Sequence, residues 1–524
     1  MMLNTTIIVY TLTATLAARL LLLLYHQLSS PLRHIPGPLW ARFTRGWYFW
    51  RVSKGYFEQD GISLHKQYGP IVRLAPGWYS CNSTDALKKI YAPGSKFTKS
   101  DWYDGWRHPH PSQWTLFTDK NNKRHGLSDV VSGGELGAIL ISANAKEAAG
   151  EAKKTFSALY SLTSLVSYEP FVDRCVDLFL DRLHEFSHSG TEIDLGYWMQ
   201  CYTFDVIGCI TYGERYGFLD EGQDIQGAIQ AVGSIGRFST LMGIYSEWYP
   251  LAFKLNGYLN DSGAGGRTFV ANFAREKIEK HKQEQQEEHL EKGGDVKILD
   301  RDGISREPFM TKMIKSHSNV IAGFDTTAIS LTAMMYHLLK TPRVLQKLRD
   351  ELNAARASGK LTGKDRINFH ESQDLPYFKV VVKEALRVHS AAGLPFWRVV
   401  PEGGVDIEGI HFPEGTVLGV SSWVAHYNED VFTDPTEFRP ERWIDQDETN
   451  LKAMNELYMP FGLGSRTCIG RHISTLEMSK LIPVLVDKFD FEIVSSPAKE
   501  GDWETENFWF VKPHNLKVRV YERR

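Results

Sequence analysis

Cysteine is scarce in this chain, which has five in 524 residues. The sequence contains no Cys-x-x-Cys pair and no cysteine-dense block, so it predicts neither a disulfide framework nor the usual zinc pattern. Such sparse cysteines fit a reducing compartment. The chain also lacks an excess of positive charge, because 60 Lys and Arg residues face 63 Asp and Glu residues. Since nucleic-acid binders normally carry a strong basic excess, we expect no nucleic-acid partner.

From residue 46 to the C-terminus the sequence has no low-complexity tract, no internal repeat and no second linker. One globular domain over residues 46–524 is therefore the simplest division of the chain. Long stretches of helical period fill its middle, and short β-like segments occur nearer its ends. This pattern predicts a mainly α-helical (α+β) body with small peripheral sheets. The predicted strands are 71–74, 78–81, 405–410, 416–420 and 517–521.

An apolar run at residues 7–24 is just long enough to span a bilayer. A cleavable signal peptide is the alternative, but it needs a basic first region, and the opening MMLNTT has no Lys or Arg. We therefore expect residues 1–28 to form an uncleaved transmembrane anchor. The first basic cluster follows the run, which predicts that the rest of the chain lies on the cytosolic side. The proline-rich residues 29–45 are expected to form a stiff hinge.

The most specific motif is FGLGSRTCIG at residues 461–470. Its three glycines remove side chains around Cys468, so a flat, bulky group could approach the backbone, and nearby amides could donate hydrogen bonds to a thiolate. Arg466 offers a fixed cation for an acidic group on such a ligand. A lone cysteine is more often an inert buried residue. The dense spacing of Phe461, the glycines, Arg466 and Cys468 favours a binding loop instead.

This loop resembles the haem-binding loop of the cytochrome P-450 family, the haem-thiolate monooxygenases, at every fixed position of Phe-x-x-Gly-x-Arg-x-Cys-x-Gly. The resemblance implies that Cys468 is the axial ligand of haem b iron, that Phe461 and Gly470 contact the haem, and that Arg466 pairs with a propionate. A thiolate ligand pushes electron density towards the iron and favours O–O cleavage. The rival interpretation, a zinc site, has only Cys468 and His472, two of the usual four ligands.

A second motif, AGFDTT, begins at Ala322 inside a segment of helical period over residues 308–340. Glycine within a helix costs roughly 1 kcal/mol relative to alanine, so Gly323 is expected to serve a purpose, such as letting a ligand lie against the helix. Standing alone, the motif would be interpreted as a packing notch. The resemblance implies that Ala322 and Gly323 line the distal haem face, and that Asp325 and Thr326 deliver protons to bound dioxygen.

A third motif places Glu384 and Arg387 three residues apart on a helix predicted over residues 376–389. As an exposed pair they would contribute only a few tenths of a kcal/mol, so the residues alone indicate a solvated helix face. In the family, this Glu-x-x-Arg pair forms a structural network with the arginine at the position of Arg442. The resemblance therefore assigns these three residues to fold integrity, and it matches Arg398 to a second propionate-pairing position.

Segments near the N-terminus, PGP at 36–38, YGPIVRLAP at 68–76 and KFTKSDWYDGW at 96–106, resemble the membrane-anchored fungal branch of the family, near pisatin-demethylase-like enzymes. The resemblance thus covers nearly the whole chain. It implies a single-pass protein of the endoplasmic reticulum membrane with a cytosolic cytochrome P-450 fold, in which haem lies between the central long helix and the cysteine loop.

The resemblance also implies the reaction, which is insertion of one oxygen atom from dioxygen into a small apolar organic substrate. Hydroxylation and O-demethylation, in secondary metabolism or detoxification, stay open. The haem domain and anchor take up the whole length, which leaves no room for a flavin or nicotinamide domain. Electrons are therefore expected from NADPH through a separate reductase, with cytochrome b5 as a further candidate partner. A haem-binding sensor without turnover is the rival, and Asp325 with Thr326 favours the enzyme. The expected substrate contacts are 98–113, 218–253, the helix before Gly323, 394–397 and 508–510.

One segment departs from the family pattern. The family has a helix here whose basic residues meet a haem propionate, and excising residues 127–150 would restore the expected spacing from His125 to Lys153. We interpret 127–150 as a retained intron, because its length is a whole number of codons and Ala143-Asn144 could encode a branch-point-like sequence. The alternatives are a genuine surface loop, which rarely splits a helix that carries ligand contacts, and a translated insertion that impairs the haem protein.

The intron interpretation predicts that most mature transcripts skip the codons for residues 127–150. Sequencing of full-length transcripts measures this directly. Reads that run uninterrupted through the segment would show that it is translated, and would place the predicted haem contacts of His125 and Lys153 in doubt.

Overall fold

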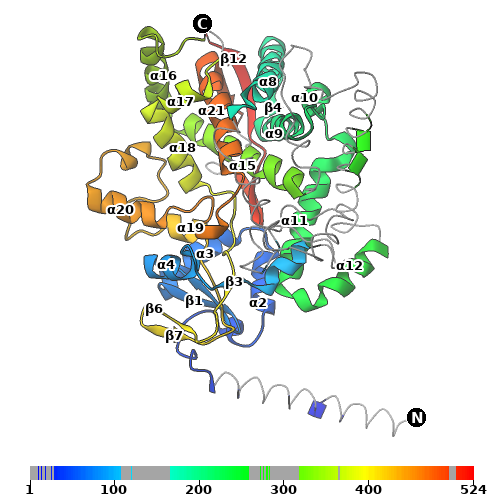
Figure 1. Ribbon diagram of the computed structural model, residues 1–524, viewed down its shortest axis with the longest axis vertical. Coiled ribbons are helices and arrows are strands. Elements are labelled where there is room, and N and C mark those ends of the chain that lie inside the picture. Colours follow the sequence, from blue (N-terminus) through cyan, green and yellow to red (C-terminus); the bar gives the residue numbers. More distant parts are fainter. Residues whose placement is uncertain are drawn as a thin grey trace, which may run out of the picture.

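The computed structural model describes residues 29–107, 118, 120, 166–258, 318–363, 366–494 and 503–523, with isolated positions before residue 29 and between 272 and 283. Within them the protein is mainly helical, with small sheets (Figure 1). This is the predicted fold class. The helices are α2 (Gly46–Val52), α3 (Phe57–Tyr68), α4 (Thr84–Tyr91), α8 (Glu169–Ser189), α9 (Leu195–Tyr212), α10 (Phe218–Glu221), α11 (Ala228–Ile244), α12 (Tyr249–Tyr258), α15 (Ser318–Lys340), α16 (Pro342–Ala357), α17 (Phe369–Gln373), α18 (Pro376–Val388), α19 (Ser422–His426), α20 (Glu448–Leu457) and α21 (Arg471–Lys488).

Helix α15 crosses the middle of the molecule in Figure 1, between α8 and α9 on one side and α16 to α18 on the other. It packs against α9, α18 and α21, and its apolar side chains belong to the largest core cluster. Its end before Pro342 is as predicted, because Pro342 occupies the first turn of α16, where no backbone N–H is needed. The N-terminal part of the predicted helix, residues 308–317, lies outside the described residues.

The main sheet has the strand order β1-β2-β8-β5-β3, with β1 and β2 paired antiparallel and β2 and β8 paired parallel. Strands β1 and β2 are buried along their whole length, as expected for a sheet covered on both faces. The predicted strands near 71, 78, 416 and 517 are therefore present. The strands are β1 (Ile71–Ala75), β2 (Trp78–Cys81), β3 (Thr98–Lys99), β4 (Ile193–Asp194), β5 (Arg398–Val399), β6 (Val405–Ile407), β7 (Ile410–Phe412), β8 (Val417–Gly419), β9 (Phe489–Ile493), β10 (Glu504–Phe508), β11 (Phe510–His514) and β12 (Lys517–Glu522).

The prediction of one strand over residues 405–410 is wrong. Strands β6 and β7 form a two-stranded hairpin, with Val405 opposite Phe412 and Ile407 opposite Ile410. The chain reverses at Glu408 and Gly409, whose φ angles are 49° and 73°. Two successive residues with positive φ make the tight turn that fits the twist of a hairpin, and the glycine that permits it was the overlooked signal.

A second hairpin, β10–β11, joins the C-terminal end of the chain to the core and packs against α15. Its turn residue Trp509 has a φ of 76° and is buried, with its ring 4.8 Å from that of Trp102. One pair before the turn, Asn507 Nδ2 donates to the buried carboxyl of Glu58 on α3 at 2.8 Å. The hairpin is thus fixed near its turn by aromatic packing and by polar contacts of Asn507.

The described residues include no helix of the length and apolar character that crossing a membrane requires. Most of the apolar run at residues 7–24 lies outside them. The transmembrane anchor over residues 1–28 therefore stays a prediction, as does the division between hinge and domain near residue 46.

The contact of Glu58 predicts a pH dependence of stability. Burial raises the pKa of Glu58 to about 7 from 4.5, against the opposing effect of Asn507. The unfolded chain releases this proton at a lower pH than the folded chain does. The free energy of unfolding therefore decreases as the pH rises from about 4.5 to 7, by on the order of 3 kcal/mol. We expect Glu58→Gln to flatten this part of the curve, measured by urea denaturation from pH 4.5 to 8.

The exposed Glu414→Gln variant is the matched control and should keep the wild-type slope. A Glu58→Gln curve that parallels the wild type would show that Glu58 titrates normally.

Candidate functional site

The cysteine loop lies between α20 and α21 and is closed by its own backbone. The amide of Cys468 donates to the carbonyl of Phe461 at 2.8 Å, and that of Gly462 donates to Met459 at 3.0 Å. A short 3₁₀ turn, Gly464–Arg466, fills the loop between these contacts. The sulfur is therefore presented by a compact turn, directly before the N-terminus of α21.

Gly464 is required by its packing against a neighbouring element. Its φ is 68°, and a Cβ atom there would lie 1.9 Å from the carbonyl oxygen of Tyr91, at the end of α4. The glycine thus makes room for the backbone at the end of α4. Gly470 is less constrained, because a Cβ atom there would lie 3.8 Å from the sulfur of Cys468, an ordinary contact distance.

The Cys468 side chain keeps accessible surface although protein surrounds it. Burial raises the pKa of the thiol, while the backbone amides of Gly470 and Arg471 and the charge of Arg471 oppose that shift. An accessible sulfur that is nevertheless surrounded by protein is expected to face a ligand space inside the fold. The amides at the start of α21 favour the thiolate there, and a coordinated metal deprotonates a thiol outright.

The other predicted residues of the loop lie close to this sulfur in the chain. Phe461 is half-buried and packs against the main core cluster. Arg466 is half-exposed and ends the 3₁₀ turn.

Arg398, on β5, is buried and donates to the hydroxyl of Tyr103 at 3.0 Å and to the carbonyl of Trp397 at 2.9 Å. Among the described residues, no carboxylate lies within ion-pair distance of its guanidinium. A buried cation without an acidic partner is costly unless a ligand supplies the negative charge. The donor set of a thiol, a buried arginine and a loop arginine therefore fits an iron-bearing ligand with acidic groups.

The AGFDTT motif lies on α15, and Asp325 within it is fully buried. Gln200 Nε2 on α9 donates to Asp325 Oδ1 at 2.9 Å, and Lys512 Nζ on β11 lies 2.8 Å from Oδ2. Thr326 is half-buried. Thr327 donates to the Gly323 carbonyl at 3.0 Å and also contacts Ser474 on α21 at 3.2 Å, so the motif lies against the helix that follows the cysteine loop.

Gly323 has a packing role within the fold. A Cβ atom there would lie 2.7 Å from Cδ1 of Ile207, so the bare backbone lets α9 approach α15 closely. The contact that the glycine permits is therefore between two helices. The side chain of Ala322 lies outside the described residues, as do His125, Lys153 and residues 127–150.

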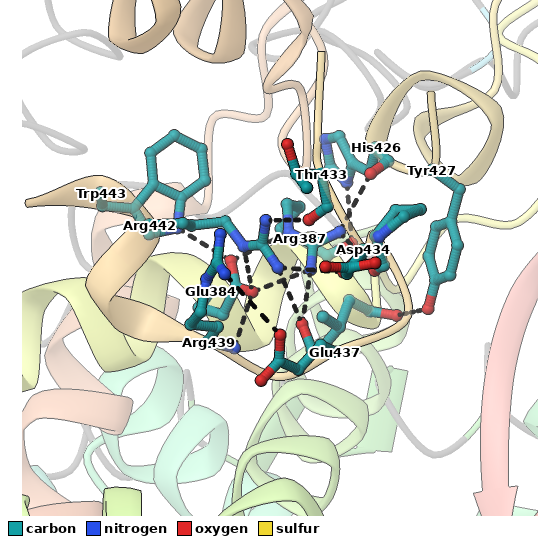
Figure 2. A network of polar contacts seen from close by, with 12 residues as sticks. Glu384, Arg387, His426, Tyr427, Thr433, Asp434, Glu437, Arg439, Arg442 and Trp443 are labelled. Atoms are coloured by element: carbon teal, nitrogen blue, oxygen red, sulfur yellow. Dashed lines mark hydrogen bonds and ion pairs between the residues drawn. The ribbon is translucent and has the colours of Figure 1, made fainter. Parts of the chain in front are cut away.

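Glu384 and Arg387 are completely buried, so the interpretation of a solvated helix face is wrong and the family pattern gave the better expectation. Figure 2 shows the Glu384 carboxylate between the guanidinium groups of Arg387 and Arg442. Arg387 Nη2 lies 2.8 Å from Oε1, and Arg442 Nε lies at the same distance. Trp443 Nε1 donates to Oε2 at 2.9 Å, and the Arg439 amide donates to Oε1 at 3.1 Å.

The charges in this network offset the cost of burial. Burial raises the pKa of Glu384, but the hydrogen bond and charge of Arg387, the charge of Arg442 and the amide of Arg439 outweigh it and hold the pKa below its usual value. The carboxylate is therefore ionised and satisfied.

The two guanidinium groups also hold the segment that leads to the cysteine loop. Arg387 donates to the carbonyls of His426 and Pro435 at 3.0 and 2.8 Å, and Arg442 donates to that of Thr433 at 2.7 Å. His426 in turn accepts a hydrogen bond from the Met459 amide at 2.9 Å. Since Met459 accepts from Gly462, a chain of contacts connects Arg387 to the loop.

Burial, and then the charge of Arg387, lower the pKa of His426 to about 3. The ring is therefore neutral, which suits a nitrogen that accepts a hydrogen bond. His426, Gln200 and Lys512 were not predicted from the sequence. All three act through contacts between segments far apart in the chain, and no local spacing marks them.

A sequence model described as Cytochrome P450 matches residues 120–518. The chain belongs to the cytochrome P450 family. Its mainly helical body is the P450 fold, and family membership implies a haem cofactor, a redox partner and an organic substrate. This P450 is an oxidoreductase that incorporates oxygen from dioxygen, and it is accordingly a haem monooxygenase.

Curated relatives of this P450 include fungal enzymes similar over nearly their whole length. Two pisatin demethylases of Fusarium vanettenii are 34% and 33% identical, and each alignment covers at least 95% of this chain and 92% of the relative. A cytochrome P450 monooxygenase of Penicillium aethiopicum is 31% identical, with 95% of both chains covered.

The buried carboxylate network of this P450 predicts a large effect on stability. Glu384→Ala leaves two buried guanidinium groups without their acidic partner, so we expect a loss of about 3–5 kcal/mol in the free energy of unfolding. Glu456→Ala, which removes only the half-buried partner of the exposed Lys88, is the control and should cost less than about 1 kcal/mol. Urea denaturation measures both, and equal losses would contradict the central role of Glu384.

Proposed function

We propose that this P450 hydroxylates or O-demethylates a small apolar organic compound in secondary metabolism or detoxification. The observation that carries the proposal is the placement of Cys468 directly before α21, while the AGFDTT motif of α15 contacts that helix through Thr327 and Ser474. A thiol and an acid–alcohol pair then serve one ligand space. The similarity to two pisatin demethylases supports demethylation as one form of the reaction.

Cys468 would hold the iron of haem b, and Arg466 and Arg398 would pair with its propionates. Phe461, Gly470, Ala322 and Gly323 would contribute to the walls of the haem site, and His125 and Lys153 would add cations if the segment between them permits. When bound, the haem supplies the activation of dioxygen for which a thiolate ligand is suited. The buried, acid-free surroundings of Arg398 support its part in this assignment.

Asp325 and Thr326 would hold and move protons at this site. A carboxylate can take a proton from solvent and pass it to a neighbouring hydroxyl, which donates it onward. Gln200 supports this role because it fixes one carboxylate oxygen and leaves the other to exchange partners.

The substrate would be apolar, because aromatic side chains gather around a small cavity of about 30 Å³ between α11, α15 and the β10–β11 hairpin. Trp106, Phe508 and Phe510 line it, each within a segment expected to contact substrate. Trp509, between the two phenylalanines, is instead buried in the aromatic cluster around Trp102. Apolar walls with a few charged groups are typical of sites that bind small organic ligands.

Electrons would come from NADPH through a separate reductase, and cytochrome b5 is a further candidate donor. The apolar run at residues 7–24 supports a single-pass anchor in the endoplasmic reticulum membrane with the body on the cytosolic side.

The carbon monoxide difference spectrum of the reduced, membrane-expressed chain tests this proposal. We expect a thiolate-type Soret band from the full chain, because Cys468 supplies the sulfur, and no such band from Cys468→Ala. Cys81→Ala, which changes a buried cysteine of β2, is the control and should keep the band.

A band that persists in Cys468→Ala would overturn the ligand assignment. A band that appears only after deletion of residues 127–150 would mean that the insertion impairs haem binding by the full chain.

A further inference from the structure

Side chains at the end of α19 cap the C-terminal end of α18. The last carbonyls of a helix have no partner within that helix. The Tyr427 hydroxyl donates to the carbonyl of Val388 at 2.8 Å, and Nδ1 of His426 lies 3.1 Å from the carbonyl of Arg387. Figure 2 shows both of these side chains beside Arg387. The short helix α19 is therefore fixed to a buried end of α18.

The ring of His426 is held in one tautomer by its neighbours. Its Nε2 atom accepts the Met459 amide at 2.9 Å, so the hydrogen of the neutral ring is on Nδ1. That hydrogen faces the carbonyl of Arg387 and the hydroxyl of Ser390, which lie 3.1 and 3.2 Å from Nδ1. Because protein groups engage both ring nitrogens, His426 connects two backbone segments and is not itself a metal ligand.

The backbone of Met459 is held by α19 on both of its polar groups. Besides the contact of its amide with His426, its carbonyl accepts from Ser422 Oγ at 3.2 Å. Ser422 and His426 are the first and last residues of α19, four residues apart, so they share one face of the helix. The Met459 carbonyl also accepts from Gly462, within the cysteine loop, at 3.0 Å. The loop thus begins at a residue that α19 fixes.

We propose that His426 is a positioning residue for the sulfur of Cys468, with Ser422 as its assistant. By fixing Met459, the two side chains keep the start of the loop, and with it the sulfur, at one place relative to α18. Contacts behind a metal ligand orient it, and loss of one typically costs about 10- to 100-fold in metal affinity or activity. The inference rests on the proposed ligation of haem iron by Cys468.

Hydrogen–deuterium exchange on the haem-loaded full chain tests the contact without turnover. His426→Phe keeps a ring against Tyr458, which stacks on His426 at 5.5 Å, but offers no acceptor to Met459. We therefore expect several-fold faster exchange of the amides of residues 459–468. His426→Gln should restore slow exchange, because its amide oxygen can accept in place of Nε2. Unchanged exchange in His426→Phe would overturn the proposal.

His65 offers a matched control, because it is also a buried histidine with two hydrogen bonds. Its partners are the carbonyl of Gly69 and the hydroxyl of Ser80, both at 2.8 Å and neither in the cysteine loop. His65→Phe should leave the exchange of residues 459–468 as in the wild type.

The lifetime of the thiolate-type band in mild urea tests the positioning role. In His426→Phe the band should disappear several-fold faster than in the wild type, while the helical circular dichroism signal persists. His426→Gln should restore the lifetime, and His65→Phe should not shorten it relative to its helical signal. A merely structural role predicts that band and helical signal decay together in both phenylalanine variants, and that result would overturn the inference.

Ser422→Ala keeps the test decisive if His426→Phe does not fold. It removes one hydroxyl and leaves the ring in place, so we expect a smaller acceleration of band loss in the same direction. A wild-type lifetime in Ser422→Ala, with His426→Phe unfolded, would overturn the inference.

The wild-type spectrum separates the two levels of failure. A wild-type chain without the thiolate-type band would overturn the proposed function itself. A wild-type band with an unchanged lifetime in the His426 and Ser422 variants would overturn the inference alone.

Discussion

The architecture around the candidate site depends on one buried carboxylate. Glu384 accepts from two guanidinium groups, an indole and an amide, so its negative charge is satisfied without water. Because Arg387 and Arg442 have donors left over, they also hold the carbonyls of residues 426–437. The ionised Glu384 thus organises residues 426–437. This segment has no regular strand, so it has few hydrogen-bond partners of its own for its backbone carbonyls.

This organisation reaches the cysteine loop through neutral contacts. His426 connects the arginine network to Met459, and Met459 connects to Gly462. The loop is therefore positioned by a charged centre that lies outside it. Asp325 is also held from a distance, by Gln200 on α9 and Lys512 on β11. Cys468 and Asp325 both have short side chains, and the residues that position them come from other parts of the fold.

The sequence predicted what depends on local spacing. The end of α15 before Pro342, the start of α18 at Pro376, and the β1 and β2 strands follow from proline positions and short periodic patterns. The partners of Asp325 and the role of His426 could not be predicted, because they depend on where distant segments meet. Gly323 and Gly464 were identified as important, but their neighbours, Ile207 and the backbone of Tyr91, become apparent only in three dimensions.

The contact of Gly464 with Tyr91 has a consequence for recombination between relatives. Tyr91 ends α4, its hydroxyl donates to the Phe396 carbonyl, and it accepts from the Val420 amide of the sheet region. A single tyrosine thus joins the sheet, α4 and the cysteine loop, although Tyr91 and Gly464 are 373 residues apart in the chain. Chimeric enzymes should therefore inherit the end of α4 and the cysteine loop from the same parent, since any side chain at position 464 would place a Cβ atom 1.9 Å from the Tyr91 carbonyl oxygen.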